Sequence, residues 1–344
     1  MRTLLRRTAA VLVATTAALS LAACGQENDD KDAGTTVLGV TDEFPITIKH
    51  KFGETVIKEE PKRVATWGWG STEAAIASGV YPVAIGEQLW TVGKGNLLPW
   101  VEDAYDAEGV KHPTLLPDDG TGTTVPYDDF IAAKPDLIIA PYSGITKGQW
   151  KKLNDIAPTL AYPEAPWTTP WDETIKLTAH ALGRSKHGDK ILSDINSYLA
   201  DEAKKHPEFE GLKIAALYPG PSNLSVYTEL EPRLTILTQL GFDAAPSIAK
   251  LDTSDGGFYY DMSWEEVDQI DADVVVTYHD NEKEAAAFLK DPKAQAIPAV
   301  REGRVAQVIG REKISAVSPP TALSFSWAGG MPDLIEKLAA AVKD

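Results

Sequence analysis

The sequence predicts an α/β protein of two lobes, each with a parallel-rich sheet, joined by one long helix. Short β-rich runs alternate with helical stretches in both halves of the chain, and an amphipathic stretch separates the halves. Strands and helices that alternate at this spacing form parallel sheets covered on both faces. The 344 residues are enough for two domains of ordinary size. We expect an N-terminal lobe at 44–170, a connecting helical stretch at 171–207 and a C-terminal lobe at 208–344.

The first 23 residues have the pattern of an export signal. Arg2, Arg6 and Arg7 precede an uncharged apolar run, and Cys24, the only cysteine of the chain, follows Ala23. A membrane-spanning helix needs about 20 consecutive apolar residues, and this run is shorter and rich in Ala and Thr. The arrangement resembles a lipobox, so we expect cleavage before Cys24, lipid attachment to it, and a place on the outer face of the cytoplasmic membrane. Sec and twin-arginine export both stay open.

Composition excludes several classes of function for the remainder. Residues 24–43 are small, polar and without periodicity, which predicts a flexible tether. No cysteine is left for a disulfide or a thiol nucleophile. The formal net charge of −17 argues against a nucleic-acid partner.

The N-terminal lobe begins with an alternating segment, 46–58, that predicts a two-stranded hairpin with Gly53 near its turn. A short helix is expected at 71–79, with Ser71 as its cap and Gly79 as its stop. Buried strands are predicted where apolar runs lead into loops, at 63–66, 82–85 and 136–140.

The C-terminal lobe repeats this plan. Strands are expected at 213–217, 273–277 and 304–309. In the connecting stretch, Ile191, Ile195, Tyr198 and Leu199 form one apolar stripe at helical spacing, and Pro207 closes the helix. Ligands of open parallel sheets bind beyond the carboxyl ends of the strands, and here those ends carry aromatic residues almost every time.

Several short motifs together resemble the substrate-binding lipoproteins of ABC importers for iron–siderophore complexes. They are Pro61-Lys-Arg63-Val64, Lys-Pro135-Asp136-Leu-Ile-Ile, Ile156-Ala-Pro158-Thr, the 171–183 stretch, Ile297-Pro-Ala-Val-Arg-Glu-Gly303-Arg-Val and Ser318-Pro319. The resemblance covers nearly the whole mature chain. It implies two Rossmann-like lobes of the class III periplasmic-binding-protein type and a role in carrying a ferric siderophore to a permease. Within the family the chain is most similar to ferric-siderophore binders, including those for catecholates.

A ferric siderophore satisfies its iron with its own oxygens, so its carrier needs a partly apolar bowl with a few donors and no cofactor or metal ligands of its own. Aromatic and cationic residues at the expected strand ends are the candidates for this bowl: Trp67, Trp69, Trp90, Tyr142, Tyr218, Tyr227, Tyr259, Tyr278 and Arg311, followed by Arg233 and His279. The resemblance further implies one acidic docking residue on each lobe, and the matching positions are Asp129 and Glu231. We expect a monomer whose partners are the cargo, the permease subunits and, through lipid alone, the membrane. The siderophore class stays open, because tryptophans favour a hydroxamate and the catecholate-binder resemblance favours a catecholate.

The same residues bear on other functions. Capture of bare zinc or manganese needs three or four ligands that meet, and the six histidines are scattered. An exported glycan-processing enzyme would need a carboxylate pair at fixed separation, which a sequence alone does not exclude. Motifs of serine hydrolases, zinc proteases and P-loop enzymes are missing from the sequence, so we expect no enzyme activity. A structural lipoprotein is disfavoured because the pattern is α/β.

Overall fold

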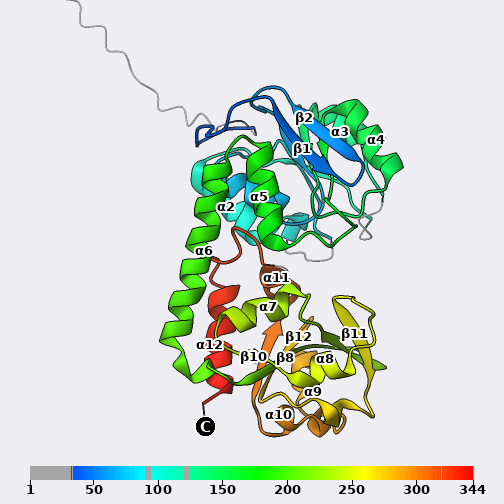
Figure 1. Cartoon of the computed structure of the whole chain (residues 1–344), viewed down its shortest axis with the longest axis vertical. Helices are drawn as coiled ribbons and strands as arrows, with labels where there is room; N and C mark the ends of the chain where they lie inside the picture. Colours follow the sequence, from blue (N-terminus) through cyan, green and yellow to red (C-terminus); the bar gives the residue numbers. More distant parts are fainter. Residues whose placement is uncertain (1–31, 33, 90–93, 120–123, 319, 344) are drawn as a thin grey trace, which may run out of the picture. The chain divides into compact units, whose positions relative to one another are not determined.

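Two β-sheets organise the chain, one in each half of the sequence. The computed structural model describes residues 32, 34–89, 94–119, 124–318 and 320–343, and Figure 1 shows their arrangement. Lys31–Asp344 belong to a single unit. The expected export segment, Cys24 and Trp90 lie outside the described residues.

The first sheet is parallel throughout and has the order β5-β4-β3-β6-β7. Its strands are short and almost fully buried, as expected of a sheet covered on both faces. The hairpin at the start of the lobe, β1 (Ile46–His50) and β2 (Gly53–Ile57), is confirmed. The remaining elements of this lobe are β3 (Val64–Thr66), α1 (Ser71–Ala77), β4 (Ala84–Gly86), η1 (Lys94–Asn96), α2 (Pro99–Glu108), β5 (Thr114–Leu116), α3 (Tyr127–Ala133), β6 (Leu137–Ile139), α4 (Lys147–Ile156) and β7 (Thr159–Leu160).

The start of α1 differs from the prediction. Gly70 occupies the N-cap position, and no side chain caps the helix. The Ser71 hydroxyl is buried and has no hydrogen-bond partner among the described residues, so its assignment as the cap was wrong. Gly79 follows the helix with φ of 82°, the left-handed conformation expected of a stop.

The second sheet combines parallel and antiparallel strands in the order β11-β9-β8-β12-β13, with β10 beside β8. The predicted strands pair in parallel, but β9 and β11, which the sequence analysis missed, extend the sheet as antiparallel neighbours of β8. The elements are η2 (Pro207–Phe209), β8 (Lys213–Pro219), β9 (Asn223–Tyr227), α7 (Pro232–Gln239), β10 (Asp243–Ala244), α8 (Pro246–Leu251), β11 (Tyr259–Ser263), η3 (Val267–Gln269), β12 (Val274–His279), α9 (Glu282–Phe288), η4 (Ala294–Ala296), α10 (Pro298–Arg301), β13 (Val305–Ile309), α11 (Arg311–Ala316) and α12 (Met331–Ala341).

A long helix joins the two lobes, as predicted. The expected stretch consists of α5 (Trp171–Ala181), which packs against α1, and the 21-residue α6 (Ser185–Lys205), with Gly183 at φ of 70° between them. Figure 1 shows α6 running from the first sheet's lobe to the second. Ile195 and Leu199 of the predicted stripe are buried in the hydrophobic core of the second lobe. None of the helices among the described residues has the length and apolarity needed to span a bilayer.

An aspartate with the same hydrogen-bonding role precedes one interior strand of each sheet, β6 in the first and β12 in the second. Asp136, just before β6, accepts hydrogen bonds from the backbone N–H groups of Lys62 and Arg63 at 2.8 and 2.9 Å. In the second lobe Asp273, just before β12, accepts from the N–H of Lys213 at 2.8 Å. The two motifs Pro61-Lys-Arg63 and Pro135-Asp136 therefore meet in space, and each aspartate fixes the register of two neighbouring parallel strands.

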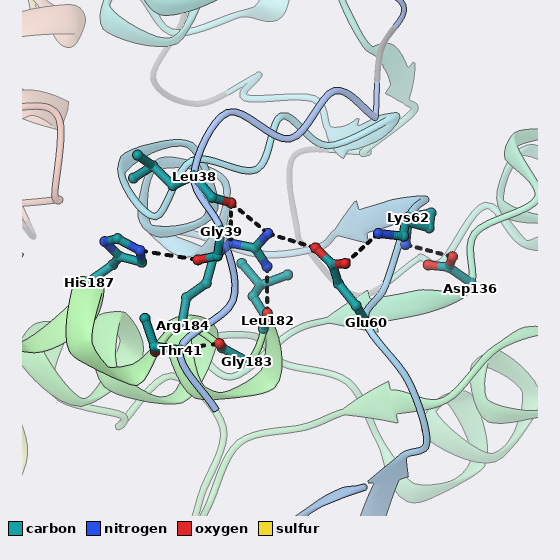
Figure 2. A network of polar contacts seen from close by, with 10 residues as sticks. All are labelled: Leu38, Gly39, Thr41, Glu60, Lys62, Asp136, Leu182, Gly183, Arg184 and His187. Atoms are coloured by element: carbon teal, nitrogen blue, oxygen red, sulfur yellow. Dashed lines mark hydrogen bonds and ion pairs between the residues drawn. The ribbon is translucent and has the colours of Figure 1, made fainter. Parts of the chain in front are cut away.

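The junction between α5 and α6 is held by a buried arginine (Figure 2). Arg184 is fully buried, and its guanidinium donates to the carbonyls of Leu182 at 2.6 Å and Leu38 at 2.9 Å. It also pairs with Glu60 at 3.0 Å. Hydrogen bonds from Lys62 and Arg184 hold the pKa of Glu60 below its usual value, although burial acts against them.

This junction also binds the segment that precedes the first lobe. Besides the Leu38 carbonyl, the N–H groups of Gly34 and Val37 bond to the carbonyls of Tyr81 and Gly79. The N–H of Thr41 bonds to the carbonyl of Gly183 at 2.7 Å. The prediction of a flexible tether through residue 43 is therefore wrong for residues 34–43, because their backbone groups are bonded to the lobe.

Loss of the Arg184 guanidinium should destabilise the protein strongly. In Arg184→Met the carbonyls of Leu38 and Leu182 lose charged donors, so we expect the free energy of unfolding to fall by about 3 kcal/mol. Arg301→Met, which removes an exposed arginine from α10, is the matched control and should change it by less than about 0.5 kcal/mol. Chemical denaturation monitored by circular dichroism measures both variants; equal midpoints would contradict this role for Arg184.

A buried histidine at the end of β12 predicts acid sensitivity. His279 is 4% exposed, its Nε2 accepts from the Gln307 amide at 3.1 Å, and burial lowers its pKa from 6.5 to about 4. Below pH 6.5 the unfolded chain gains a proton that the folded chain does not take up until about pH 4, so the free energy of unfolding falls across this window. In His279→Gln, denaturation at pH 7.5 and at pH 4.5 should give values closer together than in the parent. Equal differences between the two pH values in the parent and in His279→Gln would contradict this origin of the acid sensitivity.

Candidate ligand cavity between the two lobes

A cavity of about 730 Å³ is lined by loops from both sheets. From the first sheet come the residues after β3, β4, β5 and β6, and from the second come β9, β11 and the start of α7. This is the place where an open parallel sheet presents its loops to a ligand. A second hollow, of about 1380 Å³, extends along α5, α6 and α7 and shares Tyr142, Trp167, Glu231 and Phe258 with the first cavity.

Three aromatic rings form the wall contributed by the first lobe. Trp69, Tyr142 and Trp167 lie in a triangle with ring-centroid distances of 6.3, 5.9 and 5.7 Å. All three line the cavity, and each is supplied by a different loop. Rings held against one another present a large apolar surface with little conformational entropy to lose on binding.

Two glycines make this triangle possible. Gly68 has φ of 86°, and a Cβ there would lie 2.2 Å from the Tyr142 carbonyl oxygen. A Cβ on Gly144 would lie 2.5 Å from Nε1 of Trp167. Larger residues at either position would displace the rings.

Trp67 forms the floor of the cavity. Its side chain is 1% exposed and meets Phe130 edge-on, with ring centroids 5.9 Å apart. Its Nε1 is buried and has no hydrogen-bond partner among the described residues. A buried donor without a partner is costly, so this N–H is a local source of instability in the floor of the cavity.

Arg233 is the centre of the wall contributed by the second lobe. It follows Glu231, which caps α7, and donates to the Glu231 carboxylate from Nη1 at 2.9 Å. Its Nε donates to Ser318 Oγ, and its guanidinium lies 4.4 Å from the centre of the Tyr227 ring. Nη2 has no hydrogen-bond partner among the described residues and remains available for a ligand oxygen.

The phenols of the cavity stay protonated. Burial raises the pKa of Tyr142 and of Tyr227 to about 12, so each O–H can donate to a ligand at neutral pH. Burial also raises the pKa of Glu231, although Arg233 acts against it. The cavity therefore offers neutral donors and one cation that is already paired.

The structure brings most of the predicted aromatic residues to this cavity. Its lining includes seven of the predicted ligand-binding residues: Trp67, Trp69, Tyr142, Tyr218, Tyr227, Tyr259 and Arg233. Their contact with a ligand stays a prediction.

Three predicted residues do not line the cavity. Tyr278 is 2% exposed and packs behind Tyr227, and His279 is buried against Phe288. Arg311 is exposed and pairs with Asp280 at 2.8 Å, so a surface ion pair explains it. For Tyr278 and His279 the cause is that β12 is buried along its whole length and its end does not reach the cavity.

The docking assignment of Glu231 also needs correction. Its side chain is 6% exposed, lines the cavity and is paired with Arg233, so it does not present a carboxylate to a partner protein. Glu229, two residues earlier, is exposed. Asp129 is half-buried on α3, beside the exposed Asp128.

Several cavity residues were missed by the sequence analysis. Trp167 lies between two prolines in a segment without periodicity, and it adopts a left-handed φ of 59°. Ser225 and Asp261 come from the antiparallel strands β9 and β11, whose alternating polar and apolar residues were the available signal. Glu87, Gln88, Leu89, Asp118, Asn223 and Phe258 complete the set.

Metal ligands do not gather at this cavity. Among the described residues no group of three or more His, Cys, Asp or Glu side chains could hold a metal ion. The arrangement is suited to a bulky ligand that brings its own polar atoms.

Known proteins share this architecture. The chain is 24% identical over 282 residues to the putative ABC transporter substrate-binding lipoprotein YhfQ of Bacillus subtilis (strain 168), covering 79% of each chain. The crystal structure of PiaA from Streptococcus pneumoniae TIGR4 in complex with ferrichrome has 32% identity and a TM-score of 0.76, over 86% of this chain and 98% of that one. A periplasmic solute binding protein from Mycobacterium smegmatis str. MC2 155 has the same fold at 22% identity, with a TM-score of 0.74 over 87% of this chain and 99% of that one. Residues 64–310 match the model of the periplasmic binding protein family, and the chain belongs to that family.

Proposed function

We propose that this protein captures a ferric siderophore in the cavity between its lobes and delivers it to the permease of an ABC importer. The observation that carries the proposal is the cavity itself, in which a triangle of rings faces a buried arginine with a free Nη2. Similarity to a protein crystallised with ferrichrome supports it. Capture and release need no covalent chemistry, so no catalytic residues are assigned.

Iron enters this scheme inside the cargo. A siderophore surrounds the ferric ion with its own oxygens, so the protein contacts the organic shell. Rings pack against that shell, while the phenols and Arg233 donate to its outer oxygens. The chain needs no resident cofactor in this role.

We further propose that the protein works as a monomer held by lipid on Cys24 at the outer face of the cytoplasmic membrane. The sequence pattern before Cys24 and the similarity to a substrate-binding lipoprotein support this placement. Residues 34–41 are bound to the first lobe, so any flexible link to the anchor is confined to the residues before them.

Docking to the permease would use one acidic residue of each lobe, Asp129 and Glu229. Asp129 lies near Ile131, which is 56% exposed, and Glu229 lies beside Leu230, which is 67% exposed. These are the two most exposed large hydrophobic side chains among the described residues. An apolar contact next to a charge is the composition expected of a transient protein interface.

Calorimetric titration tests the cargo. The parent should bind at least one ferric siderophore with a micromolar or lower Kd and should bind the iron-free form more weakly. Trp69→Ala should weaken binding roughly ten- to 100-fold, because one side of the ring triangle is lost. Trp264→Phe, at a tryptophan outside the cavity, is the control and should bind as the parent does. Binding of bare zinc alone, without any ferric chelate, would replace this function by metal capture.

Docking is tested separately from capture. In Asp129→Arg and Glu229→Arg, reconstituted permease should show about tenfold weaker stimulation of its ATPase by loaded protein, since a charge complementary to a basic pocket is reversed. Cargo affinity should be unchanged in both variants. Asp194→Arg on the exposed face of α6 controls for the change in net charge, and an effect of equal size there would argue against specific docking.

A further inference from the structure

The cavity is lined by more carboxylates than cationic groups. Its lining contains four carboxylates, Glu87, Asp118, Glu231 and Asp261, and among the side chains that the structure describes Arg233 is the one cation. Residues 90–93 and 120–123 lie outside the described residues, and none of these eight residues is charged. The cavity is therefore acidic at neutral pH.

The single cation does not offset this excess. Arg233 Nη1 lies 2.9 Å from the carboxylate of Glu231, and both side chains are almost completely buried. A pair at this distance in a low-dielectric site acts on a distant charge as a dipole and not as a free cation. What Arg233 retains is its directional donor, Nη2.

Two of the carboxylates are not offset by a neighbouring cation among the described residues. Glu87, after β4, and Asp261, on β11, form no ion pair among the described residues. Asp261 accepts a hydrogen bond of 2.7 Å from the Ser225 hydroxyl, a donor that carries no charge. They belong to opposite lobes, so a ligand between the lobes experiences negative charge from both sides.

Ferric chelates differ in charge by their donor chemistry. Three hydroxamates, each singly charged, cancel the ferric charge and give a neutral complex. Three catecholates, each doubly charged, leave a complex with three negative charges. An acidic cavity repels the second kind, because like charges repel and carboxylates line the cavity on both lobes.

We propose, resting on the function proposed above, that the cargo is a ferric trihydroxamate of neutral or positive charge and that Glu87 and Asp261 exclude anionic chelates. The aromatic triangle and Arg233 Nη2 supply affinity for the shell of the complex. Glu87 and Asp261 determine which net charges of the chelate the cavity accepts. A pendant ammonium group on the chelate would be stabilised by the same carboxylates.

Three probes of graded charge test this selection: ferrioxamine B, which carries an ammonium group, its N-acetylated neutral form, and a ferric tris-catecholate. In titration calorimetry at low salt, we expect the cationic form to bind at least as tightly as the acetylated form. The tris-catecholate should bind at least about 100-fold more weakly than either. Added salt should reduce this difference in affinity, because it screens the repulsion between charges.

The double variant Glu87→Gln, Asp261→Asn should reduce the discrimination against the tris-catecholate by roughly tenfold or more. The pair Asp103→Asn, Glu336→Gln removes the same net charge from exposed positions on α2 and α12 and should leave the discrimination unchanged. Tris-catecholate binding as tight as hydroxamate binding, or equal effects of the two double variants, would overturn the charge selection while leaving siderophore capture intact. If none of the three chelates binds but another ferric siderophore does, the trihydroxamate assignment fails and siderophore capture stands; if no ferric siderophore binds, the proposed function itself fails.

Discussion

The buried guanidinium of Arg184 is the interaction on which the relation between the lobes depends. It stands immediately before α6, and its hydrogen bonds join three segments: the chain before the first lobe, the loop before β3, and the end of α5. A buried cation is tolerated only when its donors are satisfied, so these segments must occupy fixed places together. The direction in which α6 leaves the first lobe is thereby set. Since the far part of α6 is packed into the second core through Ile195 and Leu199, the cavity walls are placed as a consequence.

The aspartates that open β6 and β12 do the equivalent task inside each lobe. Asp136 and Asp273 each accept from a backbone N–H at the start of the neighbouring strand and return their own N–H to a carbonyl there, at 2.9 and 2.8 Å. Reciprocal bonds of this kind allow one register only, and they align the carboxyl ends of β3 with β6 and of β8 with β12. Loops that share no sequence similarity therefore converge at one edge of each sheet. The loops around the cavity can differ in sequence because both sheets beneath them are aligned by the same kind of aspartate hydrogen bond.

Much of this arrangement could be predicted because it depends on local patterns. Buried parallel strands are continuous apolar runs, and glycine or aromatic residues after them indicated Trp69 and Tyr142 correctly as residues of strand-end loops. The failures have physical causes. Tyr278 and His279 end an equally apolar run, but β12 lies between β8 and β13 and is buried along its whole length. Trp167 was missed because its position depends on a left-handed backbone and on the space left by Gly144, neither of which has a periodic signature. The excess of carboxylates in the cavity comes from residues far apart in the sequence, so no single segment reveals it.

Pairing Arg233 with Glu231 determines what kind of recognition the cavity can perform. An unpaired buried arginine would attract any anion, but it would be costly to bury and would bind anionic cargo with little regard to shape. With Glu231 beside it, the site loses most of that long-range attraction and keeps a donor of fixed direction, held by Ser318 and by the face of Tyr227. Affinity must then come from contact with the rings and from hydrogen bonds that only a correctly placed oxygen can accept. A carrier that must reject the many small anions outside a cell gains selectivity from this arrangement, because phosphate or citrate meets unpaired carboxylates and finds no free positive charge in return.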